Sequence, residues 1–298
     1  MPYEVIIVGG SFAGLSAAMQ LARARRRILV IDAGEPRNRF AKASHGFLGQ
    51  DGAAPAQIMR EGLRQLSAYP SVDFVHGHAV SASGEFDRFE VTLADGAAYA
   101  ARRLVLAHGV ADTLPEVPGL AERWGRTVVH CPFCHGYEFG DRPLGVLATG
   151  PLGAHQAEML PDWGPTTLFT QGLFVPEPEV KARLDRRGVT VETTPVAALL
   201  GDAPGLEAVR LADGRVLPLA ALFTAPRTAP NGGLAEALGC AFEDGPTGAY
   251  IAADGRQETN VPGVFAAGDA ARAMHNATLA SASGVMAGVG AYQSLSLG

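Results

Sequence analysis

The chain has 298 residues, of which 24 are basic and 30 acidic, giving a formal net charge of −6 at neutral pH. This length suggests about two domains, and the negative charge gives no field that would hold a nucleic acid backbone. No run reaches the roughly 18 apolar residues of a membrane span, and residues 1–4 show no charged leader, so we expect a cytoplasmic protein with no membrane partner.

The first expected unit is a strand, a glycine-rich turn, a helix and a second strand. Residues 5–8 and 28–31 are apolar, and apolar side chains recur at helical spacing between 15 and 22. The turn, Gly9-Gly10-Ser11-Phe12-Ala13-Gly14, would let the backbone approach a pyrophosphate at a helix N-terminus. Asp32, after the second strand, is spaced to bind a ribose hydroxyl. The pattern predicts a dinucleotide site, with Ser11 in place of the middle glycine, and leaves open a turn without ligand.

Further strands are expected along the chain. Residues 88–93 and 102–106 form alternating segments joined by a turn at Asp95-Gly96. A second unit begins at 144–147, turns through 150–153 and resumes as a strand near 167–169. The predicted fold class is therefore α/β, with two Rossmann-like, three-layer ββα dinucleotide-binding domains.

The last expected strand, at 264–267, enters a helix of small residues through Gly268-Asp269. A carboxylate at a strand end beside a helix N-terminus is well placed to bind a ribityl or phosphate-linked hydroxyl. Its presence favours a nucleotide at the first glycine turn over a turn without ligand.

The pair Cys131 and Cys134 carries the expected chemistry. Two cysteines separated by two residues can close a small disulfide ring, and a helix N-terminus would favour the thiolate. His135 is a candidate acid and base for the thiol protons. We expect no metal, because a zinc site would need ligands beyond this pair, with Cys240 and His130 the nearest in type. Zinc, c-type haem attachment and an inert buried pair remain alternatives, and Cys240 is expected to be a buried small hydrophobe.

With these motifs in order, the chain resembles the low-molecular-weight thioredoxin reductase family. The resemblance rests on Gly9 to Gly14, the central CxxC, and Gly263-Val264-Phe265-Ala266-Ala267-Gly268-Asp269. The form Cys-Pro-Phe-Cys-His-Gly-Tyr-Glu, with Asp32-Ala33-Gly34-Glu35-Pro36-Arg37-Asn38, is similar to a branch that includes the gliotoxin- and holomycin-type dithiol oxidases. Those enzymes oxidise dithiols with FAD and oxygen.

The resemblance implies roles for matching residues. Cys134 would face the flavin and Cys131 would exchange with the substrate sulfur, while His135 replaces an aspartate usual in the reductases. His275 stands beside the flavin in place of an arginine, with a solvated helix-start histidine as the alternative. The implied FAD contacts are Gly9, Ser11, Phe12, Ala13, Gly14, Asp32, Ala107, Gly109, Gly268, Asp269, His275, Asn276 and Ala277.

The resemblance also implies the organisation of the chain: a discontinuous FAD domain, 1–113 plus 243–298, and a nucleotide-binding-like domain, 114–242, that carries the CxxC. A homodimer is implied as well.

The second glycine turn departs from the family pattern. Alanine replaces the first glycine at Ala148, and Pro151 removes an amide donor. Thr170-Gln171-Gly172 carries neither the arginines typical of NADPH enzymes nor the acid typical of NAD enzymes. We therefore expect weak binding of nicotinamide nucleotides.

The expected function is an FAD-dependent dithiol oxidase or related disulfide oxidoreductase, using oxygen or another acceptor. A disulfide reductase fed by NAD(P)H or ferredoxin is the alternative, and a redox sensor is a third hypothesis. The substrate would be a small dithiol or disulfide, or a thioredoxin-like protein.

Overall fold

The computed structural model describes residues 2–297. It divides into two compact units, each described below by itself. Unit 1 combines three stretches of chain, Met1–Arg37, Ala56–Ala111 and Thr228–Gly298, and unit 2 combines Asn38–Pro55 with Asp112–Arg227. The chain passes between the units at four places, two of which lie in strands that pair with each other, β7 (Val110–Thr113) and β16 (Arg227–Pro230).

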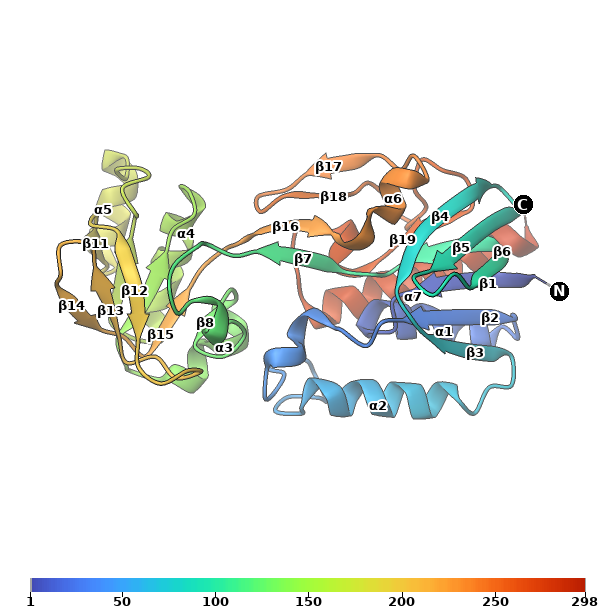
Figure 1. Ribbon diagram of the computed structural model, residues 1–298, viewed down its shortest axis with the longest axis horizontal. Helices are drawn as coiled ribbons and strands as arrows, with labels where there is room; N and C mark the ends of the chain where they lie inside the picture. Colours follow the sequence, from blue (N-terminus) through green and yellow to red (C-terminus); the bar gives the residue numbers. More distant parts are fainter. Residues whose placement is uncertain (1, 298) are drawn as a thin grey trace. The chain divides into compact units, whose positions relative to one another are not determined.

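Unit 1 is built on a seven-stranded sheet in the order β3-β2-β1-β6-β5-β4, with β19 also paired to β6 (Figure 1). Strands β3, β2, β1, β6 and β19 run parallel, and β5 and β4 form antiparallel pairs. The strands are β1 (Tyr3–Val8), β2 (Ile28–Asp32), β3 (Val72–His76), β4 (Ala79–Glu85), β5 (Arg88–Leu93), β6 (Ala98–Leu106) and β19 (Val264–Ala266). The predicted strand, turn, helix and strand are confirmed, as is the hairpin at Asp95-Gly96.

Two helices, α1 (Phe12–Arg23) and α7 (Ala277–Ser296), cover one face of this sheet (Figure 1). They approach closely because glycines of α7 lie against the α1 backbone. A Cβ on Gly284 would stand 2.1 Å from the Ala13 carbonyl oxygen. The helix expected directly after Asp269 begins only at Ala277, because the short 3-10 turn η5 (Gly268–Ala271) comes first.

The other face of the sheet buries side chains of β1 and β2 against β4, β5 and α6 (Leu234–Ala237). Helix, parallel sheet and second β layer form the predicted three-layer arrangement. Unit 1 is completed by α2 (Pro55–Leu66), β17 (Phe242–Asp244), β18 (Ala249–Ile251) and η4 (Asn231–Gly233). Cys240 lies in this second core, as expected of a small hydrophobe, and burial raises the pKa of its thiol.

Unit 2 contains a five-stranded parallel sheet in the order β11-β10-β9-β15-β8 and a small antiparallel sheet, β12-β13-β14. The parallel strands are β8 (Val128–Val129), β9 (Leu144–Leu147), β10 (Thr166–Phe169), β11 (Thr190–Glu192) and β15 (Ala221–Phe223). The others are β12 (Val196–Leu200), β13 (Ala208–Leu211) and β14 (Val216–Pro218). The second Rossmann-like domain is thus confirmed as a fold.

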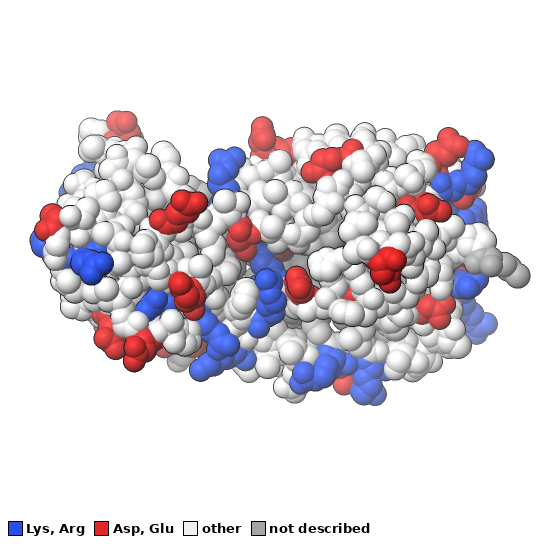
Figure 2. Space-filling model, in the orientation of Figure 1, with Lys and Arg blue, Asp and Glu red and all other residues white. Residues whose placement is uncertain are grey.

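The helices of unit 2 are α3 (Pro132–Phe139), α4 (Leu152–Met159) and α5 (Pro178–Arg186), with 3-10 turns η1 (Arg37–Phe40), η2 (Ala121–Arg123) and η3 (Leu160–Asp162). Their apolar faces meet the parallel sheet in a core that includes Val146, Ala157 and Leu184. Among residues 2–297, no helix is long and apolar enough to cross a bilayer. On the face drawn in Figure 2, acidic and basic side chains are interspersed, with no broad basic surface.

Candidate active site

The first glycine turn of unit 1 forms a cradle that side chains would fill. A Cβ on Gly9 would stand 2.2 Å from the Ala107 carbonyl oxygen, and one on Gly14 would stand 1.7 Å from the Gly9 carbonyl oxygen. Gly268, where φ is +75°, lies against the Ala13 methyl, which a Cβ on Gly268 would approach to 2.9 Å. Five of the predicted cofactor residues are therefore brought together beside the N-terminus of α1, the end of a helix that favours an anion.

Asp32 closes this cradle at the end of β2. Its Oδ1 accepts a hydrogen bond of 2.9 Å from the Gly10 amide, which fixes the carboxylate beside the turn. A Cβ on Gly10 would stand 2.7 Å from the Asp32 Cβ. Ser11 and Phe12 begin α1, where Ser11 is the N-cap without using its hydroxyl as a cap. The position of Asp32 fits the ribose contact that its spacing predicts.

Arg37 joins two of the predicted residues at the C-terminal side of the sheet. Its Nη1 lies 3.4 Å from Asp269 Oδ2 and donates to His275 Nδ1 at 2.7 Å. Because a guanidinium only donates, His275 accepts at Nδ1, which puts the imidazole proton on Nε2. His275 is therefore held in place by Arg37, and is more than a solvated histidine at the start of a helix.

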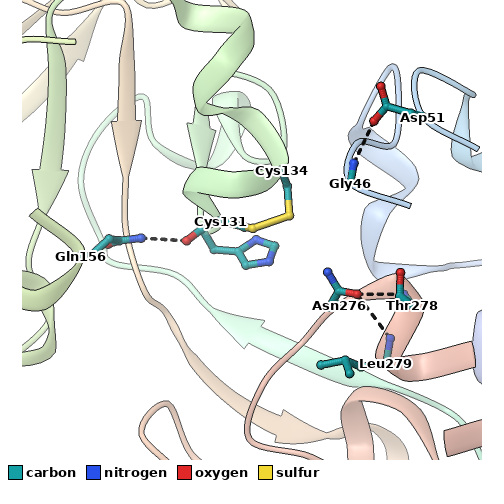
Figure 3. The surroundings of a disulfide bond; sticks show 9 residues. Gly46, Asp51, Cys131, Cys134, Gln156, Asn276, Thr278 and Leu279 are labelled. Carbon is teal, nitrogen blue, oxygen red and sulfur yellow. Dashed lines mark hydrogen bonds between the residues drawn. A yellow bond between two sulfur atoms is a disulfide. The ribbon is translucent and has the colours of Figure 1, made fainter. Parts of the chain in front are cut away.

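Asn276 is the N-cap of α7. Its Oδ1 accepts from the amides of Thr278 at 2.8 Å and Leu279 at 3.3 Å (Figure 3). This capping satisfies two amides that the first turn of a helix leaves without partners. Ala277 is the first residue of the helix. The oxygen of Asn276 is thus engaged within the fold, and its Nδ2 is the group that could reach a cofactor.

His108 lies between the predicted contacts Ala107 and Gly109. Both of its ring nitrogens are inaccessible and have no hydrogen-bond partner within residues 2–297, although part of the residue is exposed. Burial lowers the pKa of the imidazole to about 4. A buried polar group without a partner is costly. Because protein atoms cover both nitrogens, this cost belongs to the fold itself, and the fit of the residues to a nucleotide rests on the glycine cradle and Asp32.

Cys131 and Cys134 form a disulfide at the first turn of α3 in unit 2, with their Cα atoms 5.3 Å apart (Figure 3). Cys131 is the N-cap and Pro132 the first helical residue, a position that proline favours because its missing amide proton is not needed there. The predicted redox pair at a helix N-terminus is therefore present. Within the described residues, no group of three or more histidine, cysteine or acidic side chains could hold a metal ion.

His135 follows the pair on α3, and burial lowers the pKa of its imidazole. Glu138, one turn further along, acts in the opposite direction and raises this pKa, whereas His45 lowers it. His45 belongs to the stretch Asn38–Pro55 of the same unit, and its Nε2 lies 3.3 Å from Glu138 Oε1. Its Nδ1 lies 3.5 Å from Asp51 Oδ1. A neutral His135 at neutral pH can accept a proton from a thiol.

Gln156 on α4 supports the backbone before the disulfide. Its Nε2 donates to the His130 carbonyl oxygen at 2.7 Å (Figure 3), and the side chain is buried. This bond fixes the end of β8 where the chain enters α3. Gln156 therefore positions the strand end from which Cys131 follows.

The second glycine turn, in unit 2, differs from the first in its residues and hydrogen bonds. Ala148 stands in place of the first glycine, and Pro151, the N-cap of α4, has no amide proton to donate. Thr149 Oγ1 donates to the Ala225 carbonyl oxygen at 2.8 Å. After β10, Gln171 Oε1 accepts from the Val196 amide at 2.6 Å. The turn thus lacks an amide donor that a pyrophosphate could use, and the polar side chains beside it are bonded within the fold.

The sequence analysis gave no role to several residues that the structure places at these sites: Arg37, His45, His108, Glu138 and Gln156. The signal for Arg37 and Glu138 was available, because both lie inside the motifs that carry the resemblance. No local pattern marks His45 or Gln156, since each reaches its partner across a long stretch of chain. His108 could have been found as a polar residue directly after the apolar run 104–107.

The model of the pyridine nucleotide-disulphide oxidoreductase family matches residues 3–284. A protein described as thioredoxin reductase tcpT from Claviceps purpurea is 33% identical over 96% of this chain and 92% of its own. The crystal structure of an oxidoreductase from Agrobacterium tumefaciens is 50% identical with a TM-score of 0.95, covering 99% of both chains. The crystal structure of HlmI is 37% identical with a TM-score of 0.91, covering 99% of this chain and 92% of that one.

These likenesses extend over both units. Members of this family typically bind FAD. The chain therefore belongs to the pyridine nucleotide-disulphide oxidoreductase family and is an oxidoreductase of the thioredoxin reductase type.

Proposed function

We propose that the protein is an FAD-dependent dithiol oxidase, which passes electrons from a substrate dithiol through Cys131 and Cys134 to FAD, and on to oxygen or another acceptor. The single observation that carries the direction of flow is the altered second turn. Ala148 replaces a glycine, Pro151 has no amide donor, and Thr149 and Gln171 are hydrogen-bonded within the fold. A nicotinamide donor would need donors at this turn for its phosphates.

The residues of unit 1 fit FAD. The turn at Gly9 and Gly14 would hold the pyrophosphate, Asp32 a ribose hydroxyl, and Asp269 a ribityl or phosphate-linked hydroxyl. His275 and Asn276 would lie toward the flavin. Bound FAD would supply a two-electron acceptor for the cysteine pair and return those electrons to oxygen, giving hydrogen peroxide.

The thiol chemistry follows from the disulfide. A substrate thiolate attacks Cys131, the bond between the two cysteine sulfurs breaks, and Cys134 leaves as a thiolate. The second substrate thiol then attacks the substrate sulfur of this mixed disulfide and releases the substrate as a disulfide. Two electrons and two protons now belong to the cysteine pair and its surroundings. His135 accepts a proton in this exchange, and Glu138 and His45 would modulate its basicity.

A reductase fed by NAD(P)H or ferredoxin is the second candidate. It is favoured by the family's name and by the relative described as a thioredoxin reductase. The two candidates share the cysteine pair and differ in the source of electrons. They also differ in the substrate, which is a small dithiol for the oxidase and a thioredoxin-like disulfide for the reductase.

Anaerobic reduction of the purified holoprotein separates the two. Dithiothreitol should bleach the flavin or produce a long-wavelength charge-transfer band, and this response should disappear in Cys134→Ser. NADPH and NADH should leave the spectrum unchanged. Rapid bleaching by either nucleotide would overturn the oxidase proposal in favour of the reductase.

A further inference from the structure

Unit 2 contains a pocket that neither the glycine turn nor the cysteine pair accounts for. Its volume is about 570 Å³, and it is bordered by α4, α5 and the first turn of α3. Pockets of roughly 300–1,000 Å³ are the size that small molecules use. The residues of α4 and α5 that line it run from His155, in the middle of α4, to the C-terminal ends of both helices. It is therefore separate from the turn that opens α4 at its other end.

One wall of the pocket is apolar and is formed by Phe133, which lies between the two half-cystines in the sequence, and Trp163. Phe133, the second residue between Cys131 and Cys134, is 74% exposed. Its ring meets Trp163 edge to face at 5.4 Å between centroids. Trp163 also lies against α3, where a Cβ on Gly136 would stand 2.8 Å from the indole. The two aromatic rings thus form a fixed surface on the helix that carries the disulfide.

The opposite wall is cationic. Arg183 Nε lies 3.0 Å from Glu158 Oε1, and Arg187 Nη2 lies 2.8 Å from Asp162 Oδ1, so these four charges are paired. Arg186 also lines the pocket. The guanidinium of Arg186 makes no hydrogen bond or ion pair within the described part of the chain. The pocket therefore has one positive charge, that of Arg186, without an acidic partner. His155 also lines the pocket.

The geometry points to a substrate subsite, and this inference rests on the proposed function. We propose that the pocket binds the body of a small dithiol that carries an apolar chain or ring and an anionic group such as a carboxylate. The apolar part would pack on Phe133 and Trp163, and the anion would pair with Arg186. Phe133 lies between Cys131 and Cys134 in the sequence. A substrate whose apolar part packs on Phe133 would therefore have its sulfur near Cys131, at the first turn of α3.

Binding can be measured without turnover. The oxidised holoprotein should be titrated calorimetrically with oxidised lipoate, an anionic disulfide with an aliphatic chain, and with neutral lipoamide. Neither probe can exchange with the Cys131–Cys134 disulfide, since no thiol is present. We expect lipoate to bind about three- to tenfold more tightly than lipoamide, the range for a partly exposed charged contact.

Two variants assign this preference. Arg186→Gln should abolish the preference for lipoate. Lys181→Gln should retain it, because this substitution removes the same charge from the same helix at a residue that does not line the pocket. Phe133→Ser should weaken both probes to a similar extent. In turnover, the ratio of kcat/KM for dihydrolipoate over dihydrolipoamide should fall in Arg186→Gln alone.

Equal binding of the two probes by the wild-type protein, or equal effects of Arg186→Gln and Lys181→Gln, would overturn the subsite. Fast oxidation of a reduced thioredoxin with no detectable binding of either probe would overturn it as well, in favour of a protein substrate. If NADPH reduces the flavin, the oxidase proposal fails on its own. The calorimetric comparison still decides the pocket in that case, because it requires no electron flow.

Discussion

The two strand–turn–helix units of this chain share a sequence pattern but differ in the groups that their turns offer to a nucleotide. In unit 1, Gly9 and Gly14 approach backbone oxygens where a Cβ has no room. In unit 2, Ala148 replaces the first glycine, Pro151 has no amide proton, and the Thr149 hydroxyl donates to the Ala225 carbonyl oxygen. A Rossmann-like unit can therefore keep its architecture while its nucleotide turn loses a glycine and an amide donor.

The largest expected effect compares matched glycines in the two turns. Gly10→Ala should weaken FAD binding about 10- to 100-fold, because its Cβ would stand 2.7 Å from the Asp32 Cβ and overpacking costs about 1–3 kcal/mol. Gly150→Ala should leave FAD affinity and dithiol oxidation unchanged, since nothing lies within 4 Å of a Cβ there. Flavin content and FAD titration of the apoprotein measure both. Equal flavin loss in the two variants would contradict the comparison.

In the cofactor-free protein, protonation of His108 in unit 1 should lower the free energy of unfolding as the pH falls. The pKa of this imidazole is about 4 in the folded protein, against a usual value of 6.5. The unfolded chain therefore binds the proton first as the pH falls, so stability is complete above about pH 6.5 and is lost toward pH 4. This loss amounts to about 3 kcal/mol.

Denaturant titrations of the apoprotein between pH 4 and 7 measure this loss. His108→Asn should flatten the dependence on pH over this window, because asparagine does not titrate. An unchanged slope in the variant would show that other groups control acid stability.

The second turn should regain nucleotide affinity only when its glycine, its amide donor and a positive charge are restored together. Gln171→Arg alone should change NADPH affinity little, since the Ala148 and Pro151 side chains remain in the turn. The triple variant Ala148→Gly, Pro151→Ala and Gln171→Arg should bind NADPH about tenfold more tightly, because a charge-assisted contact contributes about 1.5–3 kcal/mol. Calorimetric titration with NADPH tests this. Tight binding by the wild-type protein would remove the distinction between the turns.

The smallest effects concern proton transfer to His135, which lies beside the Cys131–Cys134 disulfide of unit 2. His45 lowers the pKa of His135 and Glu138 raises it, so His45→Gln and Glu138→Gln should displace the pH profile of dithiol reduction in opposite directions. The profile should move to higher pH in His45→Gln and to lower pH in Glu138→Gln. Rates at neutral pH should change about two- to fivefold.

Stopped-flow reduction by dithiothreitol across pH measures these profiles. His78→Gln serves as a matched control, because His78 is an exposed histidine of unit 1 whose ring lies 4.0 Å from Glu35. Displacement of the two profiles in the same direction would exclude the assigned roles.

The sequence by itself determined the two nucleotide-binding folds, the first glycine turn and the cysteine pair. These features depend on local rules: apolar periodicity, glycine where a Cβ has no room, and the short ring that a CxxC can close. The partners of Arg37, His45 and Gln156 and the burial of His108 follow only from the tertiary structure. Each owes its position to a contact or to burial that brings distant segments together, such as Arg37 with His275 and Gln156 with His130. No local pattern encodes such a contact, because packing of whole elements determines it.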